Sequence, residues 1–453
     1  MTMMKTRLSR PPAFRLLAAA ALLAAAATAA TARDFTVATI SPEGGGQARL
    51  PAISSTGLVA WQQSPADPDG AGRTPTDIYS WKDGTLANRT GDDPRVAGSA
   101  TRPVVNGDTI AFTANCPTTD QSGIPFQLSI PPKTDEMAEL ENDYPSLFGH
   151  SIPEPPSTAE GEEASTTPPP ERSTTVDYRE ATGMTPDIVL CNPDGSIKRI
   201  TPGNHEYSFP VLSDTAVGFL CARTWPYGYE MIGWKNGSDQ LIQITTNYFY
   251  VQNPSISGNQ LVFQAWDGHD YEIYLHDFET GETRAITQNA FDDMAPVICD
   301  GVIAWVAYPT VNAEIFLWED GTITKISTGS TDNAEPSIWN GRVVWQGVDD
   351  DGDLEIYYYN NRRTIKLTSN TWDDVAPQIA DGIVAWSSYI DNWDAEAVAL
   401  DLSDNILFRL SDNSYEDINV RTAGEKIVWQ SITPDGAVIQ LATPAAPREG
   451  EIH

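Results

Sequence analysis

The sequence is poor in positive charge. Lys and Arg number 28 against 62 Asp and Glu among 453 residues, which gives a net charge of −34 at pH 7. A surface of this sign repels nucleic acid and anionic lipid, so we expect no nucleic-acid partner. It suits metal ions, basic proteins and neutral sugars.

Common catalytic motifs are also missing. The chain has no GxSxG, HExxH or GxxxxGKS/T, and no GxGxxG ahead of a helix, and its five histidines are scattered. A glycosidase needs only two carboxylates roughly 5 to 9 Å apart, and the chain offers many such pairs. We therefore expect a binding module rather than an enzyme. The alternative is a glycoside hydrolase or polysaccharide lyase that uses carboxylates.

Cysteine is scarce, and its spacing excludes a zinc site. The four cysteines are Cys116, Cys191, Cys221 and Cys299, and none has CxxC spacing. An oxidising compartment permits two disulfides in three connectivities, and four buried free thiols are the other outcome. A bridge between Cys116 and Cys191 is one candidate.

Long apolar runs are missing as well, so no membrane span is expected. Four cations precede the run Leu16–Ala30, which has signal-peptide length, and Ala30 and Ala32 fit an A-x-A cleavage site. We expect cleavage after Ala32 and a periplasmic or secreted protein, with an Ala-rich anchor helix as the alternative. Cleavage removes four cations and no acids.

What the sequence does contain is a repeat. Four consecutive segments begin at Pro254, Pro296, Pro336 and Pro377, a period of about 41 residues. Each runs through a turn with Gly, an apolar strand ending in an aromatic, a loop, an acid, "IY" or its equivalent, a second turn, and "IT" or "LT". These runs of Val, Ile, Tyr and Trp between turn residues predict four strands per unit.

The same frame extends over the chain. The aromatic of the second strand recurs at Trp61, Phe112, Phe219, Phe263, Trp305, Trp345, Trp386 and Trp429. Four strands per unit of 40 to 45 residues predict an all-β fold, a single β-propeller. The last unit has material for three strands, and the N-terminal segment Asp34–Ser41 fits a fourth that closes the ring. This count gives eight blades, with seven as the alternative if the first or second unit is degenerate.

Segments such as "GNQLVFQAWDG" and "EIFLWEDG" resemble the TolB-type propeller repeats of exported bacterial and archaeal cell-surface proteins. The resemblance covers about 340 residues and implies the fold, while such repeats serve binding, scaffolding and catalysis alike. The chain lacks the N-terminal α/β domain and the Ser-Pro-Asp-Gly turn of TolB itself. A TolB role in outer-membrane linkage is therefore not implied.

We expect five parts: a signal peptide (1–32), propeller (33–116), an insertion (117–186), propeller (187–444) and a tail (445–453). The insertion lies between the second and third strands of the second blade. Its middle, Pro153–Thr175, has the Pro, Glu, Ser and Thr composition of disorder, and Thr134–Asp143 fits a short helix. It is either a lid or partner-binding arm, or a tolerated surface loop.

One face of the ring carries the functional prediction. The loops from strand two to three and from strand four to the next strand one share a face, and they alternate carboxylates with aromatics. Such a rim suits sugars or a basic protein. The candidate ligand-binding residues are Trp225, Trp266, Asp267, Asp292, Asp293, Trp372, Asp373, Asp374 and Trp393.

One acid per unit has a structural interpretation instead. Because it recurs at the start of each third strand, we expect it to accept backbone N–H bonds from the adjoining loop. These acids are Asp77, Asp187, Glu230, Glu272, Glu314, Glu355 and Glu396.

The acidic turn Asp349, Asp351 and Asp353 is the candidate metal site. No register of it gives an EF-hand. Starting at Asp349 puts Leu354 at the Gly position and Asn360 at the final Glu position, and starting at Gly347 loses the first ligand and puts Tyr358 at the final position. A looser calcium site, with Asp373 and Asp374 across the rim, is the remaining form. We expect a monomeric scaffold module that requires no cofactor and binds a polysaccharide or an envelope protein.

Overall fold

The computed structural model describes residues 35–42, 46–65, 75–91, 93–120, 122–129, 183–224, 227–246, 249–329, 331–390 and 394–445. Within these ranges the chain is built from strands, and it forms no helix with the length and apolarity to span a bilayer. The predicted signal peptide, the segments Thr134–Asp143 and Pro153–Thr175, and the chain after residue 445 lie outside them.

The described strands follow the predicted repeat. We number the units along the chain and give the strands in order. Units 1 to 3 are β2 (Gln47–Ile53), β3 (Val59–Ser64), β4 (Asp77–Lys82), β5 (Thr85–Asn88); β6 (Ala100–Asn106), β7 (Thr109–Pro117), β8 (Met184–Cys191), β9 (Ile197–Arg199); and β10 (Tyr207–Leu212), β11 (Ala216–Thr224), β12 (Tyr227–Lys235), β13 (Leu241–Gln243). Units 4 to 6 are β14 (Phe249–Ser257), β15 (Gln260–Trp266), β16 (Tyr271–Asp277), β17 (Thr283–Ala285); β18 (Asp293–Cys299), β19 (Val302–Ala307), β20 (Glu314–Glu319), β21 (Thr322–Lys325); and β22 (Asn333–Trp339), β23 (Arg342–Val348), β24 (Leu354–Tyr359), β25 (Thr364–Lys366). Unit 7 is β26 (Asp374–Ala380), β27 (Ile383–Ser388), β28 (Glu396–Asp401), β29 (Ile406–Arg409), and unit 8 is β30 (Glu416–Ala423), β31 (Lys426–Thr433), β32 (Gly436–Pro444) with β1 (Phe35–Thr39).

Hydrogen bonds join these strands into seven sheets, of which six have four antiparallel strands. The seventh has eight strands, because a single parallel pair, Gln47 with Ala437, links unit 1 to unit 8. Counted by sheets, the fold is consistent with a seven-bladed propeller, whereas the sequence predicted eight.

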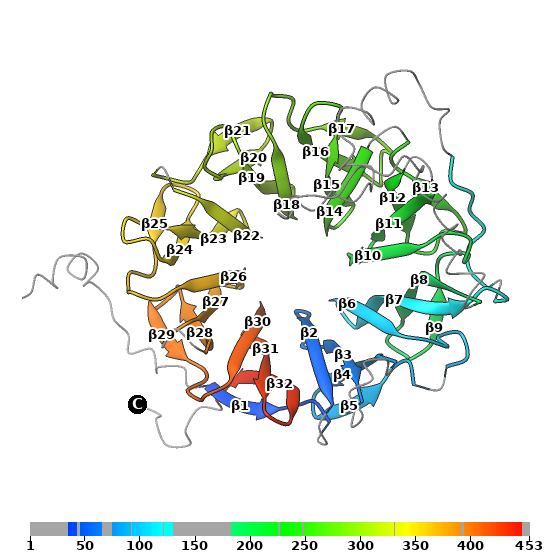
Figure 1. Cartoon of the computed structure of the whole chain (residues 1–453), viewed down its shortest axis with the longest axis horizontal. Coiled ribbons are helices and arrows are strands. Elements are labelled where there is room, and N and C mark those ends of the chain that lie inside the picture. Colours follow the sequence, from blue (N-terminus) through cyan, green and yellow to red (C-terminus); the bar gives the residue numbers. More distant parts are fainter. Residues whose placement is uncertain are drawn as a thin grey trace, which may run out of the picture.

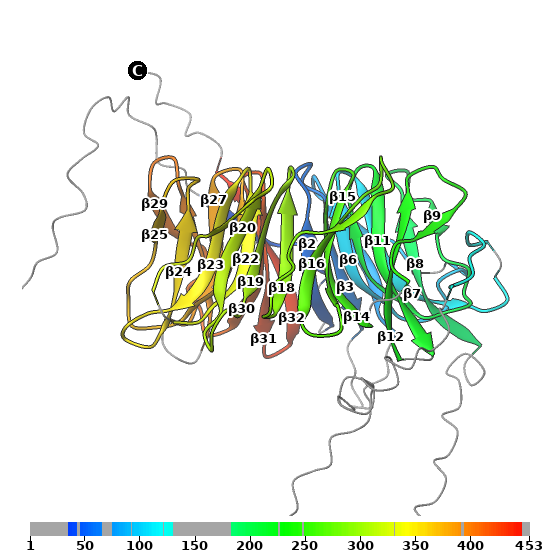
Figure 2. The ribbon, with the colours of Figure 1, turned by 90° about the horizontal axis from the view of Figure 1, so that it is seen from above.

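The sheets stand around a ring (Figure 1). The first strand of each unit lies nearest the centre, and the fourth lies on the outside. Seen from the side, the strands run between two faces on which the connecting loops gather (Figure 2). The alternation of strand direction therefore sets which loops share a face, as the sequence predicted.

The N-terminal strand completes the last unit. β1 pairs with β32 in antiparallel register, from Phe35 opposite Pro444 to Thr39 opposite Gln440. Ile40 N donates to the Ile439 carbonyl at 2.9 Å, and Ile439 N donates to the Ser41 hydroxyl at 3.0 Å. The segment thus takes the place of a fourth strand, which confirms the predicted closure.

The core lies between neighbouring units. In each unit the aromatic of the second strand is buried against apolar side chains of the unit before it. Trp345 packs with Ala304 and Ile315 of unit 5, and Trp61 packs with Val428 and Ile439 of unit 8. Burying a side chain of this size contributes roughly 2 to 3 kcal/mol. The recurring aromatic is thus the residue that holds adjacent units together.

Every innermost strand has the same β-bulge. It is centred on a residue with φ between +49° and +56° in each unit: Leu50, Arg102, Phe209, Asn253, Ala295, Glu335, Ala376 and Asn419. Proline follows in seven of the eight units. Because proline has no N–H, it fits a bulge where no ladder bond is needed. This explains why the repeat begins with proline.

The bulge also joins one unit to the next. A Gln side chain on the second strand of the preceding unit accepts the N–H of the bulge residue. We call these inter-unit bonds the Gln latches: Gln62 to Arg102 (3.3 Å), Gln264 to Ala295 (2.7 Å), Gln346 to Ala376 (2.7 Å) and Gln430 to Leu50 (3.3 Å). The last of them crosses the closure of the ring.

All four cysteines are free, and three of them are buried. Across the β7–β8 hairpin, Cys116 lies opposite Thr185 and Cys191 lies opposite Ile110. Thr185 and Cys191 are six residues apart, roughly 20 Å along a strand, which is too far for the candidate bridge. Burial raises the pKa of Cys116 to about 12, so this thiol is unreactive.

The insertion leaves the propeller between β7 and β8, as predicted, but its first residues stay on the ring. Ile124 and Leu128 are buried beside units 2 and 3, and Ser129 exchanges two 2.8 Å hydrogen bonds with Gln243. Residues 122–129 therefore pack against the outer side of units 2 and 3, although we assigned them to the insertion from the sequence.

Candidate functional site

The acid at the start of each third strand is structural. A Thr or Ser hydroxyl after the fourth strand accepts the N–H of the residue that follows the acid; Thr368, for example, accepts from Ile356 at 2.8 Å. The acid itself accepts loop N–H groups in four units: Asp187 from Gly203, Glu272 from Asn289, Glu355 from Asn370, and Glu396 from Asn413, at 2.6 to 3.1 Å. This confirms the predicted role in these four units; Asp77, Glu230 and Glu314 accept from side chains, including the Thr or Ser hydroxyl. The hydroxyl explains the repeated "IT" and "LT".

Asp293 and Asp374 lie beneath the rim rather than on it. Each is 1% exposed and accepts the indole N–H of a tryptophan twelve residues later, Trp305 at 2.6 Å and Trp386 at 2.9 Å. Their second oxygens accept from the side chains of Asn289 and Asn370. We predicted both acids as ligand contacts. Each is instead buried and makes two hydrogen bonds within the protein, so neither is accessible to a ligand.

Asp292 and Asp373 tie two loops of one face together. Asp292 accepts the N–H of Tyr271 at 3.0 Å, and Asp373 accepts the N–H of Leu354 at 2.8 Å. In each case one carboxylate oxygen connects the loop after strand four to the loop before strand three. Asp373 is exposed and Asp292 is half-buried, so Asp373 is the more accessible of the two.

The predicted neighbours of unit 6 do meet. Asp351, Gly352 and Asp353 face Thr371, Trp372 and Asp373 across an open depression of about 400 Å³. The Trp372 ring is half-buried, and Asp351 and Asp373 are exposed. An indole ring thus lies beside three carboxylate residues, which is the arrangement expected for the rim.

The predicted metal ligands of this turn are not equivalent. Asp349 pairs with Lys366 at 2.5 Å and accepts N–H bonds from Asp351 and Gly352 at 2.8 and 3.1 Å. The hydrogen bond from Lys366 is the main reason why the pKa of Asp349 is lowered to about 2. Lys366 already neutralises Asp349, so this turn attracts a cation less strongly than its four aspartates suggest.

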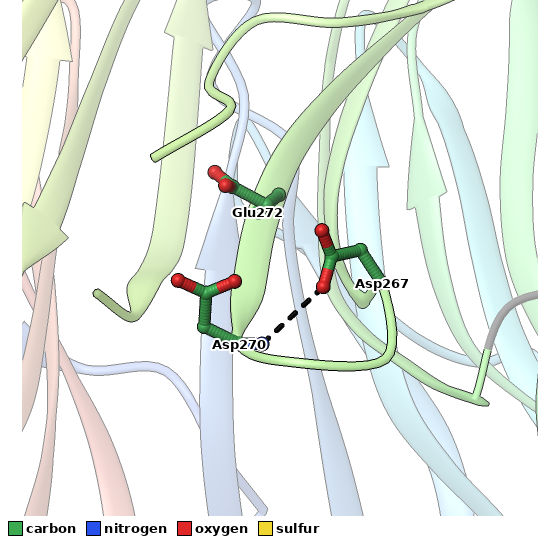
Figure 3. A group of neighbouring side chains, drawn as sticks. All are labelled: Asp267, Asp270 and Glu272. Atoms are coloured by element: carbon green, nitrogen blue, oxygen red, sulfur yellow. Dashed lines mark hydrogen bonds between the residues drawn. The ribbon is translucent and has the colours of Figure 1, made fainter. Parts of the chain in front are cut away.

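A second acidic turn lies in unit 4, between β15 and β16. The carboxylate oxygens of Asp267, Asp270 and Glu272 lie within 4.8 Å of one another (Figure 3). Burial first, then the charges of Glu272, Asp267 and Asp292, raises the pKa of Asp270 to about 6. Trp266 precedes this turn, half-buried in an edge-to-face contact with Tyr271 at 5.4 Å.

Of the nine predicted ligand residues, Trp225 and Trp393 lie outside the described residues. Trp266 and Asp267 belong to the turn of unit 4, and Trp372 and Asp373 to the depression of unit 6. The sequence-based prediction missed Asp270 and Glu272 as partners of Asp267. It also missed the tryptophan bonds of Asp293 and Asp374, although the constant spacing of twelve residues was a visible signal.

Comparison with known proteins supports the fold alone. No protein-family profile and no curated protein sequence matches the chain. Among solved structures, a prolyl endopeptidase aligns with a TM-score of 0.51 and 9% identity over 86% of this chain and 55% of that one. The β-propeller domain of the Trilobed protease from Pyrococcus furiosus gives 0.48 and 11% over 77% and 96%. TolB from Acinetobacter baumannii gives 0.33 and 12% over 57% and 76%.

The chain spans between 55% and 60% of the length of three peptidase chains that it matches. At these identities the likeness shows a β-propeller and nothing of activity.

Proposed function

We propose that this protein is an exported, monomeric binding module that contacts a polysaccharide through its rim. The observation that carries the proposal is the depression of unit 6, where the Trp372 ring lies beside Asp351, Asp353 and Asp373. An indole face packs against the apolar face of a sugar ring, and carboxylates accept hydrogen bonds from its hydroxyls. The net charge of −34 favours a neutral or basic polysaccharide over an acidic one.

Export is part of the proposal because of the N-terminal sequence. A cationic start, the apolar run Leu16–Ala30 and the small residues before position 33 support a periplasmic or secreted protein. An envelope protein is the other partner that an acidic, aromatic rim suits, and the experiment below separates the two.

We further propose that the ring has eight blades. Trp61 packs on unit 8 as Trp345 packs on unit 5, and Gln430 binds Leu50 as Gln346 binds Ala376. The contact between units 8 and 1 therefore repeats the contact between other units. Units 1 and 8 count as one sheet only because of the single parallel pair Gln47–Ala437, so we count them as two blades.

Replacement of Trp372 tests the binding proposal. We expect Trp372→Ala to weaken binding to a neutral polysaccharide about tenfold, or roughly 1.4 kcal/mol, because the stacking surface is lost. Affinity electrophoresis through a panel of neutral, basic and acidic polysaccharides measures this. Trp318→Ala is the matched control. Trp318 is also a half-buried indole, but it lies near the C-terminal end of β20, away from the rim loops, and it is covered by Arg284.

The result is interpretable only if both variants keep the thermal unfolding transition of the parent. Equal retardation of Trp372→Ala and the parent by every polysaccharide would contradict the proposal. Binding to an envelope protein that Trp372→Ala abolishes, with no polysaccharide bound, would assign the same rim to a protein partner.

A further inference from the structure

The acidic turn of unit 4 is built so that its carboxylates converge. Asp267 accepts the N–H of His269 at 2.8 Å and of Asp270 at 3.3 Å, and its own N–H donates to the Asp270 carbonyl at 3.1 Å. Gly268 has φ +116°, a conformation that favours glycine, and so allows the tight return. Figure 3 shows the side chains of Asp267, Asp270 and Glu272 around this turn, and one carboxylate oxygen of each lies within 4.8 Å of the others.

One of these carboxylates is buried with an oxygen that no protein group satisfies. Asp270 is 7% exposed, and its Oδ1 makes no hydrogen bond. Glu272 beside it is 1% exposed. An unpaired buried carboxylate oxygen is costly, and in native proteins it usually indicates a bound water or ion.

Comparison of the units shows that unit 4 lacks a cation beside the acid of its third strand. In four other units, the residue two positions before the Thr or Ser hydroxyl is a cation that pairs with the acid of the third strand. The pairs are Arg199 with Asp187 (2.7 Å), Lys325 with Glu314 (2.6 Å), Lys366 with Glu355 (3.6 Å) and Arg409 with Glu396 (3.2 Å). In unit 4 this position is Ala285, before Thr287.

Unit 3 uses a different cation for the same purpose, because Arg223 lies 3.1 Å from Glu230. Among the described residues no Lys or Arg pairs with Glu272, while Asp267 and Asp270 add two further negative charges to it. Unit 1 also lacks the cation, but there Asn88 donates to the acid, Asp77, at 3.0 Å. Unit 4 thus has no positive side chain at a place where three carboxylates meet.

We propose that Asp267, Asp270 and Glu272 bind a divalent cation, and that calcium is the ion. Carboxylate oxygens are the ligands that hard cations prefer, and calcium takes six to eight oxygens in flexible geometry. Three carboxylates leave room for water and carbonyl oxygens. The ion would replace the charge that lysine or arginine supplies in units 2, 3, 5, 6 and 7, and it would fix the loop that follows Trp266. This site is independent of the proposed sugar contact.

Calcium titration of the chelator-treated full chain tests the site. We expect calcium to raise the thermal unfolding temperature, and terbium to bind with luminescence that excitation of Trp266 and Tyr271 sensitises. Asp270→Asn should weaken binding by at least about tenfold, while leaving the turn intact, because the hydrogen bonds that shape it use the main chain of residue 270. Asp349→Asn is the matched control in the acidic turn of unit 6 and should bind calcium as the parent does.

A second variant keeps the test independent of the loss of one ligand. Ala285→Lys restores the cation of units 5 and 6, so it should abolish the calcium response and raise the unfolding temperature of the metal-free protein. The proposal is overturned if the parent binds neither ion, if Asp270→Asn binds like the parent, or if Asp349→Asn alone loses binding.

Discussion

At the residue scale, single positions of the repeat vary together. Where the acceptor twelve residues before the aromatic is Asp or Asn, as in units 5 to 8, the aromatic is Trp and its indole N–H is satisfied. Where that position is Ala100, Tyr207 or Val251, the aromatic is Phe, which needs no acceptor. In unit 1 the position twelve residues before Trp61 is Arg49, and the indole N–H donates to the Gln63 side chain at 3.0 Å instead. A buried indole without a partner is costly, so tryptophan occurs where an acceptor lies within reach.

His276 gives a prediction at this scale. It is 2% exposed, its Nδ1 contacts the Thr283 hydroxyl at 2.8 Å, and its ring meets Phe278 edge-on. Burial lowers the pKa of His276 below its ordinary value of 6.5. As pH falls below about 6.5, the unfolded chain takes up this proton before the folded protein does, so acidification lowers the free energy of unfolding.

We expect His276→Gln to remove this part of the pH dependence. Between about pH 7 and pH 5 the parent should lose up to about 2 kcal/mol more than the variant, as measured by urea unfolding. Parallel losses in the two proteins would show that His276 is protonated at the same pH in the folded and unfolded states.

At the element scale, the innermost strand is held by its bulge as well as by its ladder. The bulge turns one N–H toward the preceding unit, and the Gln latches accept it at 2.7 to 3.3 Å. A residue other than glycine at positive φ costs roughly 1 to 2 kcal/mol. The latch offsets part of this cost and fixes the spacing of two units.

Gln346→Ala tests the latch. It removes the acceptor of the Ala376 N–H, and we expect a loss of about 1 to 3 kcal/mol in the free energy of unfolding. Gln378→Ala is the control, because the Gln378 side chain bonds only the carbonyl of its neighbour Pro377 at 2.9 Å. Equal losses in denaturant unfolding would mean that the latch adds nothing beyond side-chain packing.

At the scale of the whole molecule, the decisive feature is closure. β1 and β32 bring residues about 400 positions apart into register, and Ile40 bonds to Ile439. Thr39 and Gln440 are consequently a non-hydrogen-bonded pair, with Cα atoms about 4.5 Å apart. That separation lies within the range a disulfide spans.

We expect Thr39→Cys combined with Gln440→Cys to form a disulfide that raises the free energy of unfolding by about 2 to 5 kcal/mol. Denaturant unfolding with and without reductant measures it, and the reduced form of the same variant is the control. A disulfide that forms without any gain would contradict this expectation, because strain in the folded protein would then cancel the entropy lost by the unfolded chain.

The repeat made most of the fold predictable. A period of about 41 residues and its turn residues gave the strands and the closing segment, because each unit must bury the same aromatic. The sheet count was not predictable, since it depends on the single pair Gln47–Ala437. The rim was harder to predict from the sequence. Asp293 and Asp374 lie in acidic loop segments that suggest exposure, but their hydrogen bonds with Trp305 and Trp386 bury them. Ala285 occupies the position that holds a cation in four other units, and this is visible only when the units are aligned position by position.

Closure by the N-terminal strand also constrains the order of folding. A chain is synthesised from its N-terminus, so β1 is made first but has no partner strand until β32 exists. Throughout that interval, β1 and the edge of unit 1 carry unpaired backbone groups, which invite pairing with other chains. A product truncated before residue 436 would keep this exposure permanently. We therefore expect delayed or incomplete synthesis to cause aggregation through the unpaired β1 strand.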